Sequence, residues 1–592
     1  MRIALLTESA FPTARSVEGG WCERLTRGLP EHEFELYALG ATRHDPLPEP
    51  SPARLLRLRH ADPAGGPLGS LLSGGVLRGL RRRRALTAYR ELVRSLVEPG
   101  ATGGFGPALY ALAEAGRGGG LPALLRSGAA LDVIESAWRT PGARGTIGPG
   151  SVGEPLVRDA LVAVDLLERC LRPLSAPWYG RDALAAADLC HAVDGGLGVL
   201  PGLLAKHDHG TPLLITEHSL HLRERARGYR TAPYRWPVRA LLLAFFRLLA
   251  TEGYRQAGLI TPGSAYDRRW QLHCGADPES IRVVYQGTAR AGEPPAGPEP
   301  ALPTLVWSGP IEPYGGLVAM LHAFATLRGQ IPDAVLRIEG EVPVGGLAHA
   351  EHCRDLARRL LPDRPDAVRF PDGFPDSAPD TSPATSPDRA VPPGTGAEQG
   401  TVLVFSGTRG VPPRLLAEAM LSGRPVVATD VGAAREVVGP TGLLVPAEDP
   451  LALAAACAAL LDDPERRSRL GTAGRLRAQE LYAVEPAASA FRGLYLELVS
   501  RWPGAGPEPV PVPEDLAPLA ALARQPFARS ADHWLGSAPD CPPDPGRGAA
   551  ARPTGRGSAR SRCRSGPGRA GCGCRSRWRR VPDERRSRPR PA

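Results

Sequence analysis

The sequence predicts an α/β protein with two parallel-sheet domains and a C-terminal tail that forms no core. Three observations lead to this prediction. The chain has 592 residues, which is more than one hydrophobic core usually holds. Apolar strand segments alternate with helical segments in two separate stretches, and alternation of this kind is typical of parallel sheets. After about residue 501 the composition changes to Pro, Gly, Arg and Ser, which cannot bury a core.

The first domain is expected over residues 1–292. It opens with a strand (RIALLTES), a Gly-containing loop (FPTARSVEGG), a helix (WCERLTRGLP) and a second strand (HEFELYALG), the order of a Rossmann-like domain. Further helices are expected near 84–97 and 107–115. From residue 151 the strands DLCHAV, PLLITEH and LITPG alternate with helices, of which WPVRALLLAFFRLLATEGYRQA is the longest.

A Pro- and Gly-rich linker at 293–302 separates a second Rossmann-like domain, expected over 303–485. Its strands are TLVWSG, AVLRIEG, AVRF, TVLVFS, PVVATD and LLVP. The turn-forming, polar segment 371–400 predicts a disordered insert in this domain. A last helix is expected over 486–502, followed by a disordered tail over 503–592.

The basic net charge of +10 belongs to the end of the chain. Residues 541–592 contain 15 Arg and three acidic residues, so the rest of the chain is near −2. We therefore do not expect a nucleic-acid partner for the protein as a whole. The tail itself has two further interpretations, a segment that binds polyanions and a product of GC-rich DNA read in a shifted frame.

Neither a membrane-spanning segment nor a signal peptide is evident, and the cysteines outside the tail are scattered singles, so we expect a cytoplasmic protein. Cys572 and Cys574 lie in Arg- and Gly-rich sequence, where an unstructured tail is favoured over a zinc site. The preference for Arg over Lys is typical of a GC-rich, actinobacterial genome.

Five ordered blocks resemble one family. They are LLTESAFP with the following Gly pair, DLCHAVDGGLGVLPGLLAK, TPLLITEHSLHLRER, EGYRQAGLITPGSAYDRRWQLHCGADPESIRVVYQG and AEAMLSGRPVVATDVGAAREVVGPTGLLVP. Together they resemble the retaining glycosyltransferases of family four, the glycogen-synthase and sucrose-synthase type, and most closely the Pel-polysaccharide subgroup. The resemblance implies the GT-B fold, in which two Rossmann-like domains face each other across a cleft. It also implies a nucleotide-sugar donor and no metal cofactor.

The resemblance assigns roles in the N-terminal domain. Gly19 and Gly20 would let the backbone approach the donor, although a Gly pair alone would favour a tight turn. His218, directly after an apolar strand, would lie near the reacting carbon of the donor sugar, the alternative being a surface or capping His. Arg223 and Arg225 would contact acceptor or phosphate, with a solvated charge cluster as the other interpretation.

In the C-terminal domain, Glu418 matches the family glutamate that binds the donor ribose hydroxyls, with an exposed helix glutamate as the alternative. Gly432 would begin the turn whose amides face the donor, and Arg435 would continue that donor-binding block, followed by Glu436. Ligands of open α/β sheets bind at the carboxyl ends of the strands, which suits these assignments.

Several family residues are missing. Gly410 stands where the family has a first glutamate that contacts the transferred sugar. Pro310 and Gly315 replace an Arg and a Lys that pair with the donor diphosphate. Gln286 replaces the Asn of an Asn-Gly turn, and Ala433 replaces a second Gly. Because such charges contribute strongly to binding an anion, their loss puts activity in question.

The leading functional prediction is an enzyme that transfers a hexose, with retention, from a nucleotide-sugar to a saccharide, lipid or small-molecule acceptor. The alternative is a catalytically degenerate partner in polysaccharide synthesis. A peripheral membrane or polysaccharide-synthesis complex is a further expected partner, and an Arg-tail polyanion binder is the third interpretation.

Overall fold

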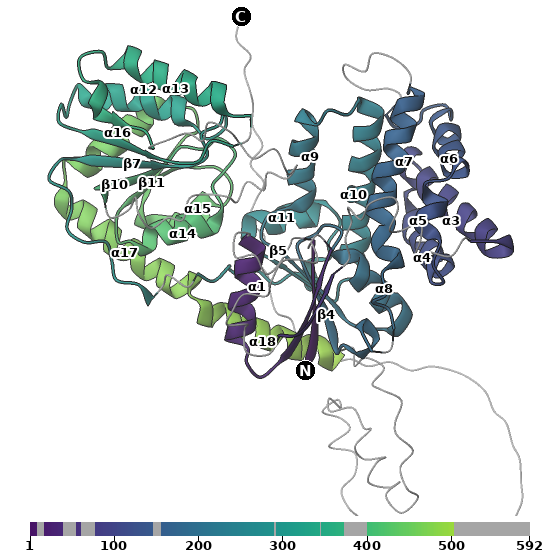
Figure 1. Cartoon of the computed structure of the whole chain (residues 1–592). Helices are drawn as coiled ribbons and strands as arrows, with labels where there is room; N and C mark the ends of the chain where they lie inside the picture. Colours follow the sequence, from purple (N-terminus) through teal and green to yellow (C-terminus); the bar gives the residue numbers. More distant parts are fainter. Residues whose placement is uncertain are drawn as a thin grey trace, which may run out of the picture. The chain divides into compact units, whose positions relative to one another are not determined.

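The structure is a computed structural model of the chain, and it describes residues 1–8, 17–39, 55–60, 77–145, 155–180, 182–288, 292–343, 345–371 and 399–501. Two sheets organise this part of the chain (Figure 1). We call the part built on the first sheet the N-terminal lobe and the part built on the second the C-terminal lobe. The predicted insert, except at its ends, and the predicted tail lie outside the described residues.

The N-terminal sheet is fully parallel, with the strand order β3-β2-β1-β4-β5-β6. Successive strands are added on one side of β1 up to β3 and on its other side from β4 onward. Leu5 of β1 accordingly pairs with Leu36 of β2 on one side and with His191 of β4 on the other. The strands are Arg2–Thr7, Glu33–Ala38, Leu55–His60, Leu189–Val193, Leu213–Glu217 and Leu259–Pro262.

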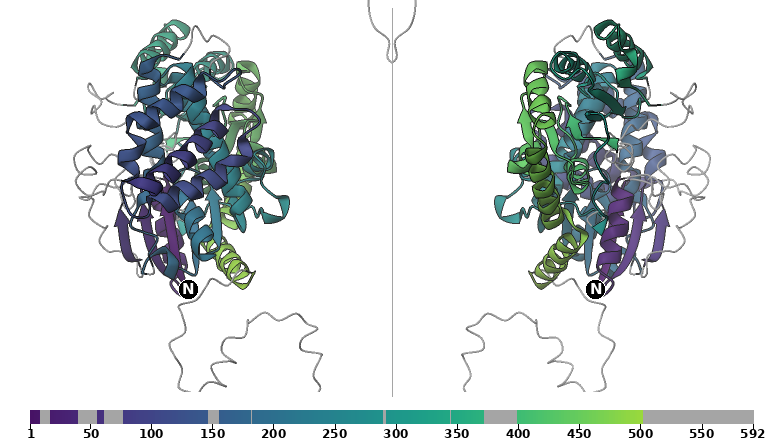
Figure 2. Two further views of the ribbon diagram at one scale, coloured as in Figure 1. Left: turned by 90° about the vertical axis from the view of Figure 1, so that its right-hand side faces the viewer. Right: turned by 90° about the vertical axis from the view of Figure 1, so that its left-hand side faces the viewer.

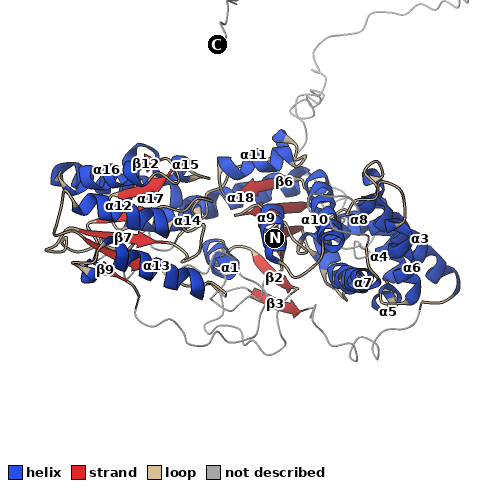
Figure 3. Cartoon of the chain, turned by 90° about the horizontal axis from the view of Figure 1, so that it is seen from above, coloured by secondary structure: helices blue, strands red, loops and turns tan. Residues whose placement is uncertain are grey.

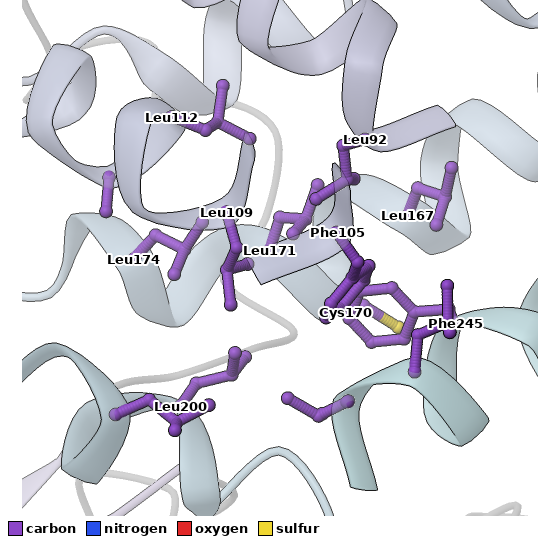
Figure 4. Close-up of a cluster of buried hydrophobic side chains, with 14 of the residues drawn as sticks. Leu92, Phe105, Leu109, Leu112, Leu167, Cys170, Leu171, Leu174, Leu200 and Phe245 are labelled. Carbon is purple, nitrogen blue, oxygen red and sulfur yellow. The ribbon is translucent and has the colours of Figure 1, made fainter. Parts of the chain in front are cut away.

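Helices cover both faces of this sheet. In the largest apolar core, side chains from one face of the sheet pack against the helices between residues 79 and 256. This core includes Leu92, Phe105, Leu171 and Phe245 (Figure 4). The dark blue helices α3 to α6 pack against one another and against α7 (Figure 2). The helices are α1 (Val17–Gly28), α3 (Gly79–Val97), α4 (Phe105–Gly116), α5 (Leu121–Leu125), α6 (Gly128–Trp138), α7 (Val157–Leu171), α8 (Val199–His209), α9 (His221–Thr231), α10 (Trp236–Gln256) and α11 (Ala265–His273).

One boundary differs from the sequence prediction. Gly19 and Gly20 were expected in a loop, but α1 already begins at Val17, so both glycines lie in its first turn. The preference of glycine for loops is weak beside the packing of Trp21, Cys22 and Leu25, which bury one side of this helix against the sheet.

The C-terminal sheet is also parallel, in the order β12-β11-β10-β7-β8-β9. One core joins it to α12, α13 and α16, and a second joins its other face to α14, α15 and α17 (Figure 3). The strands are Thr304–Ser308, Val335–Glu339, Val368–Arg369, Val402–Phe405, Val426–Thr429 and Leu443–Val445. The helices are α12 (Leu317–Arg328), α13 (Leu347–Leu360), α14 (Pro413–Leu421), α15 (Ala434–Val438), α16 (Pro450–Leu461) and α17 (Pro464–Tyr482).

The last described helix, α18 (Val484–Arg501), follows the C-terminal lobe in sequence but packs on the N-terminal sheet. Its Phe491, Leu494, Tyr495 and Leu498 share a core with Ile3 and other residues of the first strands. None of the helices in the described part of the chain combines the length and the apolar character that a bilayer span requires.

Candidate active site

Polar residues follow three neighbouring strands of the N-terminal sheet at their carboxyl ends. Glu8 follows β1, Asp194 follows β4, and His218 follows β5. The backbone of Asp194 has φ of 78°, which is uncommon for a residue with a side chain and is concentrated at functional sites. This edge of a parallel sheet is where α/β proteins bind their ligands.

Glu8, Asp194, His221 and Arg225 form a connected polar cluster at this edge. Arg225 forms an ion pair with Glu8 and donates its Nε–H to His221 Nε2 at 3.0 Å. His221 therefore carries its proton on Nδ1, which lies 3.2 Å from Asp194. Glu8 also accepts the backbone N–H of Leu197 at 2.9 Å. Glu8, Asp194 and His221 were not predicted from the sequence alone. A polar residue directly after a strand is a signal that could have indicated Glu8 and Asp194, whereas His221 begins α9.

Arg223 lies apart from that cluster. Its guanidinium is 5.3 Å from the ring centre of Tyr266 and 5.8 Å from that of Trp270, both on α11. It also donates to the backbone carbonyl of Arg409 in the C-terminal lobe, at 3.4 Å. Arg223 and Arg225, which the sequence paired, thus have different surroundings.

The imidazole of His218 is enclosed without a hydrogen-bond partner. Neither ring nitrogen is accessible or bonded, and the ring meets Trp21 edge to face at 4.8 Å. Burial above all, together with the positive charges of Arg24 and Arg414, lowers the pKa of His218 to about 4, although Asp194 acts in the opposite direction. His218 is therefore neutral at pH 7, with one donor and one acceptor that nothing in the protein uses.

Glu418 is buried on α14, with 4% of its surface exposed, rather than being an exposed helix glutamate. Its Oε1 accepts hydrogen bonds from Thr288 Oγ1 at 2.9 Å and from Arg414 Nε at 2.7 Å. Its Oε2 is buried and has no partner. One carboxylate oxygen thus remains available to a ligand hydroxyl.

Arg24 and Arg414 both interact with His218 and with Glu418. Arg24, on α1, acts electrostatically on both His218 and Glu418, and Arg414 acts on His218 and is bonded to Glu418. The Nε and one terminal nitrogen of Arg24 are buried without a partner. A Cβ added at Gly20 would lie 3.3 Å from the Arg24 guanidinium, so this glycine leaves room for Arg24. Of the other glycine of the pair, Gly19, the structure fixes only its place in α1.

Gly432 and Gly410 lie against each other, with φ of 67° and 90°. A Cβ added to either would come within 3.3 Å of the other's Cα. Arg435 does not join the buried group, because it is exposed and forms an ion pair with Asp430. The structure thus brings together His218 and Glu418 with Arg24 and Arg414, and leaves Arg435 outside.

The loop that carries Pro310 and Gly315 closes on itself. A Cβ added at Gly315 would lie 2.0 Å from the Pro310 carbonyl oxygen, so the backbone fills the space that a basic side chain would need. Arg409 stacks on Tyr314 in the same loop, 3.0 Å from the ring centre. Its guanidinium therefore has a partner in this loop.

A small pocket borders the other side of Arg24 and has a cavity volume of about 10 Å3. Trp21, Gly287, Val484 and Phe491 line it with Arg24. This volume is enough for about one water molecule and too small for a nucleotide. Within the described ranges, no group of three or more His, Cys, Asp and Glu side chains is arranged to hold a metal ion.

Comparison with known proteins assigns the two lobes to different family models. Residues 1–279 match a domain of unknown function, DUF3492, and residues 397–463 match the glycosyl transferases group 1. Among solved structures, Anabaena HepE in complex with UDP is similar with a TM-score of 0.50 and 14% identity, over 84% of this chain and 100% of that one. The chain has the GT-B glycosyltransferase fold.

Curated relatives are transferases as well. A lipopolysaccharide core biosynthesis mannosyltransferase, LpsB of Rhizobium meliloti, is 41% identical over 14% of this chain and 24% of the relative. D-inositol 3-phosphate glycosyltransferase 2 of Catenulispora acidiphila is 30% identical over 46% of this chain and 62% of the relative. The chain thus spans less than two thirds of the length of either relative. In sequence order, the match to DUF3492 precedes the match to the glycosyl transferases group 1.

Proposed function

We propose that this chain transfers a hexosyl group, with retention, from a nucleotide-sugar to a saccharide, lipid or small-molecule acceptor. The observation that carries the proposal is the pair of buried groups with unused hydrogen-bonding capacity, His218 and Glu418 Oε2. Buried polar atoms are almost always bonded, and a ligand is the simplest partner for atoms left without one. The resemblance to the family-four enzymes implies that both residues contact the donor.

The proposed roles follow from the chemistry of the two side chains. Glu418 would accept a ribose hydroxyl, and His218, being neutral, would exchange hydrogen bonds with a hydroxyl of the donor sugar. In the reaction the bond from the anomeric carbon to the diphosphate breaks and the acceptor oxygen bonds to the same face of that carbon. The acceptor proton passes to the departing diphosphate oxygen. Neither step requires a protein nucleophile or a metal ion.

The relatives support a nucleotide-sugar donor, since HepE is described with UDP and the curated relatives are mannosyl- and glycosyltransferases. We further propose membership of the Pel-polysaccharide subgroup of family four, a saccharide acceptor and a cytoplasmic site of action. A peripheral membrane or polysaccharide-synthesis complex would then present the acceptor.

The test is titration of UDP, GDP and ADP, and of their sugars, into the full chain by calorimetry, with donor breakdown followed by NMR. We expect one diphosphate series to bind at millimolar concentration or tighter and its sugar to be hydrolysed or transferred. The anomeric configuration of the product reports retention. The variant His218→Ala should lose turnover and keep diphosphate binding, whereas failure of every nucleotide to bind would refute the proposal.

Pro310, Gly315 and Gly410 favour the second candidate, a catalytically degenerate protein that acts as a binding or regulatory partner. These residues lack the charges that the related enzymes direct at the donor. Saturable nucleotide binding without breakdown or transfer of any sugar, in the same experiment, would favour this candidate.

A further inference from the structure

Arg24 is a half-buried cation on α1. Its Nε and one terminal nitrogen are enclosed without a hydrogen-bond partner, although a guanidinium carries five donors that proteins normally satisfy. Burial and the neighbouring Arg414 lower its pKa to about 10, although Glu418 and Glu23 act in the opposite direction. Burying such a charge is costly unless a counter-charge joins it.

The hydrogen-bond donors of the two arginines are only partly used by the protein. Arg414 donates its Nε–H to Glu418, whereas the Nε and one terminal nitrogen of Arg24 have no partner. His218 is neutral at pH 7 and adds no further positive charge. An anion is therefore the ligand that this group is suited to bind.

The position of the two arginines corresponds to the middle of a nucleotide-sugar. In such a molecule the diphosphate lies between the ribose and the transferred sugar. Glu418 stands at the proposed ribose end and His218 at the proposed sugar end. Arg24 lines one pocket with Trp21, which packs on His218, and with Gly287, which precedes the Thr288 that is bonded to Glu418. Arg414 is itself bonded to Glu418, so both arginines lie close to these two ends.

We infer that Arg24 and Arg414 together bind the diphosphate of the donor and replace the basic residues missing at Pro310 and Gly315. The inference rests on the proposed function. Arg24 comes from α1 of the N-terminal lobe and Arg414 from α14 of the C-terminal lobe, so the diphosphate is held from both lobes. Guanidinium groups suit this task because their planar donors match phosphate oxygens.

The loop at 310–316 is consistent with diphosphate binding by Arg24 and Arg414 in place of basic residues at positions 310 and 315. Its backbone occupies the space at Gly315, and Arg409 is stacked on Tyr314. The charge that the loop lacks is instead carried by two side chains that are distant from it in sequence.

The test measures binding of phosphate ligands to the full chain and to its variants Arg24→Met and Arg414→Gln. The phosphate ligands are UDP, GDP, ADP and inorganic pyrophosphate, and the nucleosides uridine, guanosine and adenosine serve as ligands without phosphate. We expect each variant to weaken binding of the preferred diphosphate and of pyrophosphate about tenfold or more, and to leave nucleoside binding unchanged. Arg24→Lys should recover part of the affinity. The control Arg358→Gln, at an exposed arginine paired with Asp355, should bind like the wild type.

Stability separates this role from a structural one. If Arg24 serves to bind an anion, Arg24→Met should unfold at the same or a higher temperature than the wild type in the absence of ligand. The variant should also lose the increase in unfolding temperature that diphosphate gives the wild type. Wild-type binding that Arg24→Met and Arg414→Gln both retain would overturn the inference and leave the proposed function standing. Failure of the wild type to bind any diphosphate would overturn both.

Discussion

Gly410 stands where the related enzymes carry a glutamate, and the backbone there excludes a simple reversion. Its φ of 90° suits glycine, and its α-carbon faces that of Gly432. A side chain at this position would have to strain its own backbone and displace a second glycine with positive φ. The missing glutamate is therefore linked to a local conformation as well as to a lost charge.

We predict that Gly410→Ala lowers the free energy of unfolding by about 1 kcal/mol or more, because alanine is strained at positive φ. Gly410→Glu should be destabilised as well and should not bind nucleotide more tightly. Denaturant titration measures the first effect and calorimetry the second. The matched control is Gly493→Ala on the exposed face of α18, where nothing lies within 4 Å and alanine should be neutral or stabilising.

Glu217 is a buried carboxyl at the end of β5, beside the proposed site. Its Oε2 accepts hydrogen bonds from Tyr254 at 2.5 Å and Gln271 at 2.7 Å. Burial nevertheless raises its pKa to about 7, and the nearby Asp194 contributes in the same direction. Between pH 4.5 and 7 the unfolded chain therefore releases this proton while the folded chain keeps it.

Stability linked to Glu217 should accordingly fall as pH rises from about 4.5 to 7 and then remain level. Because Glu217→Gln cannot ionise, its free energy of unfolding should rise relative to wild type by about 2 to 3 kcal/mol across that window. Urea titrations at several pH values measure the difference. Exposed Glu351→Gln should show no such divergence, and parallel curves for Glu217→Gln and wild type would contradict the assignment.

At the scale of elements, α18 ties the end of the described chain to the first sheet. Phe491 contacts Trp21 with ring centres 5.4 Å apart, and Tyr495 lies 2.8 Å from His191 Nδ1 through its hydroxyl. Trp21 in turn packs against His218. The helix thus supports the residues behind the proposed site as well as closing a core.

We predict that Phe491→Ala destabilises the protein by about 3 to 5 kcal/mol, because a buried aromatic ring is removed from a packed core. Leu496→Ala on the same helix should change stability by less than about 0.5 kcal/mol, since Leu496 is 57% exposed. Chemical denaturation of both variants gives the comparison. Equal effects would mean that α18 does not dock through its Phe491 face.

At the scale of the whole molecule, Glu436 links the two lobes. From α15 it accepts the backbone N–H of Ala265 at 2.8 Å and of Tyr266 at 3.3 Å, in the first turn of α11, and the hydroxyl of Tyr285 at 3.0 Å. The bond from Thr288 to Glu418 is a further link. The second of these links uses Glu418 of α14, which is part of the proposed donor site.

Glu436→Ala should lower the free energy of unfolding by about 1 to 2 kcal/mol, because several donors lose one shared acceptor. It should also weaken nucleotide binding, since the diphosphate would be held from both lobes. Scanning calorimetry and titration provide the two readouts. Glu436→Gln, which keeps one acceptor oxygen, should be intermediate, and a variant indistinguishable from wild type would show that the link contributes nothing.

The sequence by itself determined the fold class. Period and alternation are local properties, so the strands of the C-terminal sheet, helices such as α10 and the strands of the N-terminal sheet other than β3 follow from the residues themselves. The strand β3, Leu55–His60, was not predicted. The positions of His218 and Glu418 followed from short motifs after a strand and within a helix. The start of α1 did not, because packing of Trp21 and Leu25 outweighed the loop preference of two glycines.

Only the tertiary structure decided which side chains share the site. Arg24 and Arg414 are 390 positions apart, and no local pattern predicts that both approach His218 and Glu418. The same holds for the cluster of Glu8, Asp194 and Arg225. Whether a buried polar atom lacks a partner depends on every neighbour that the fold supplies, so this property exists only in three dimensions.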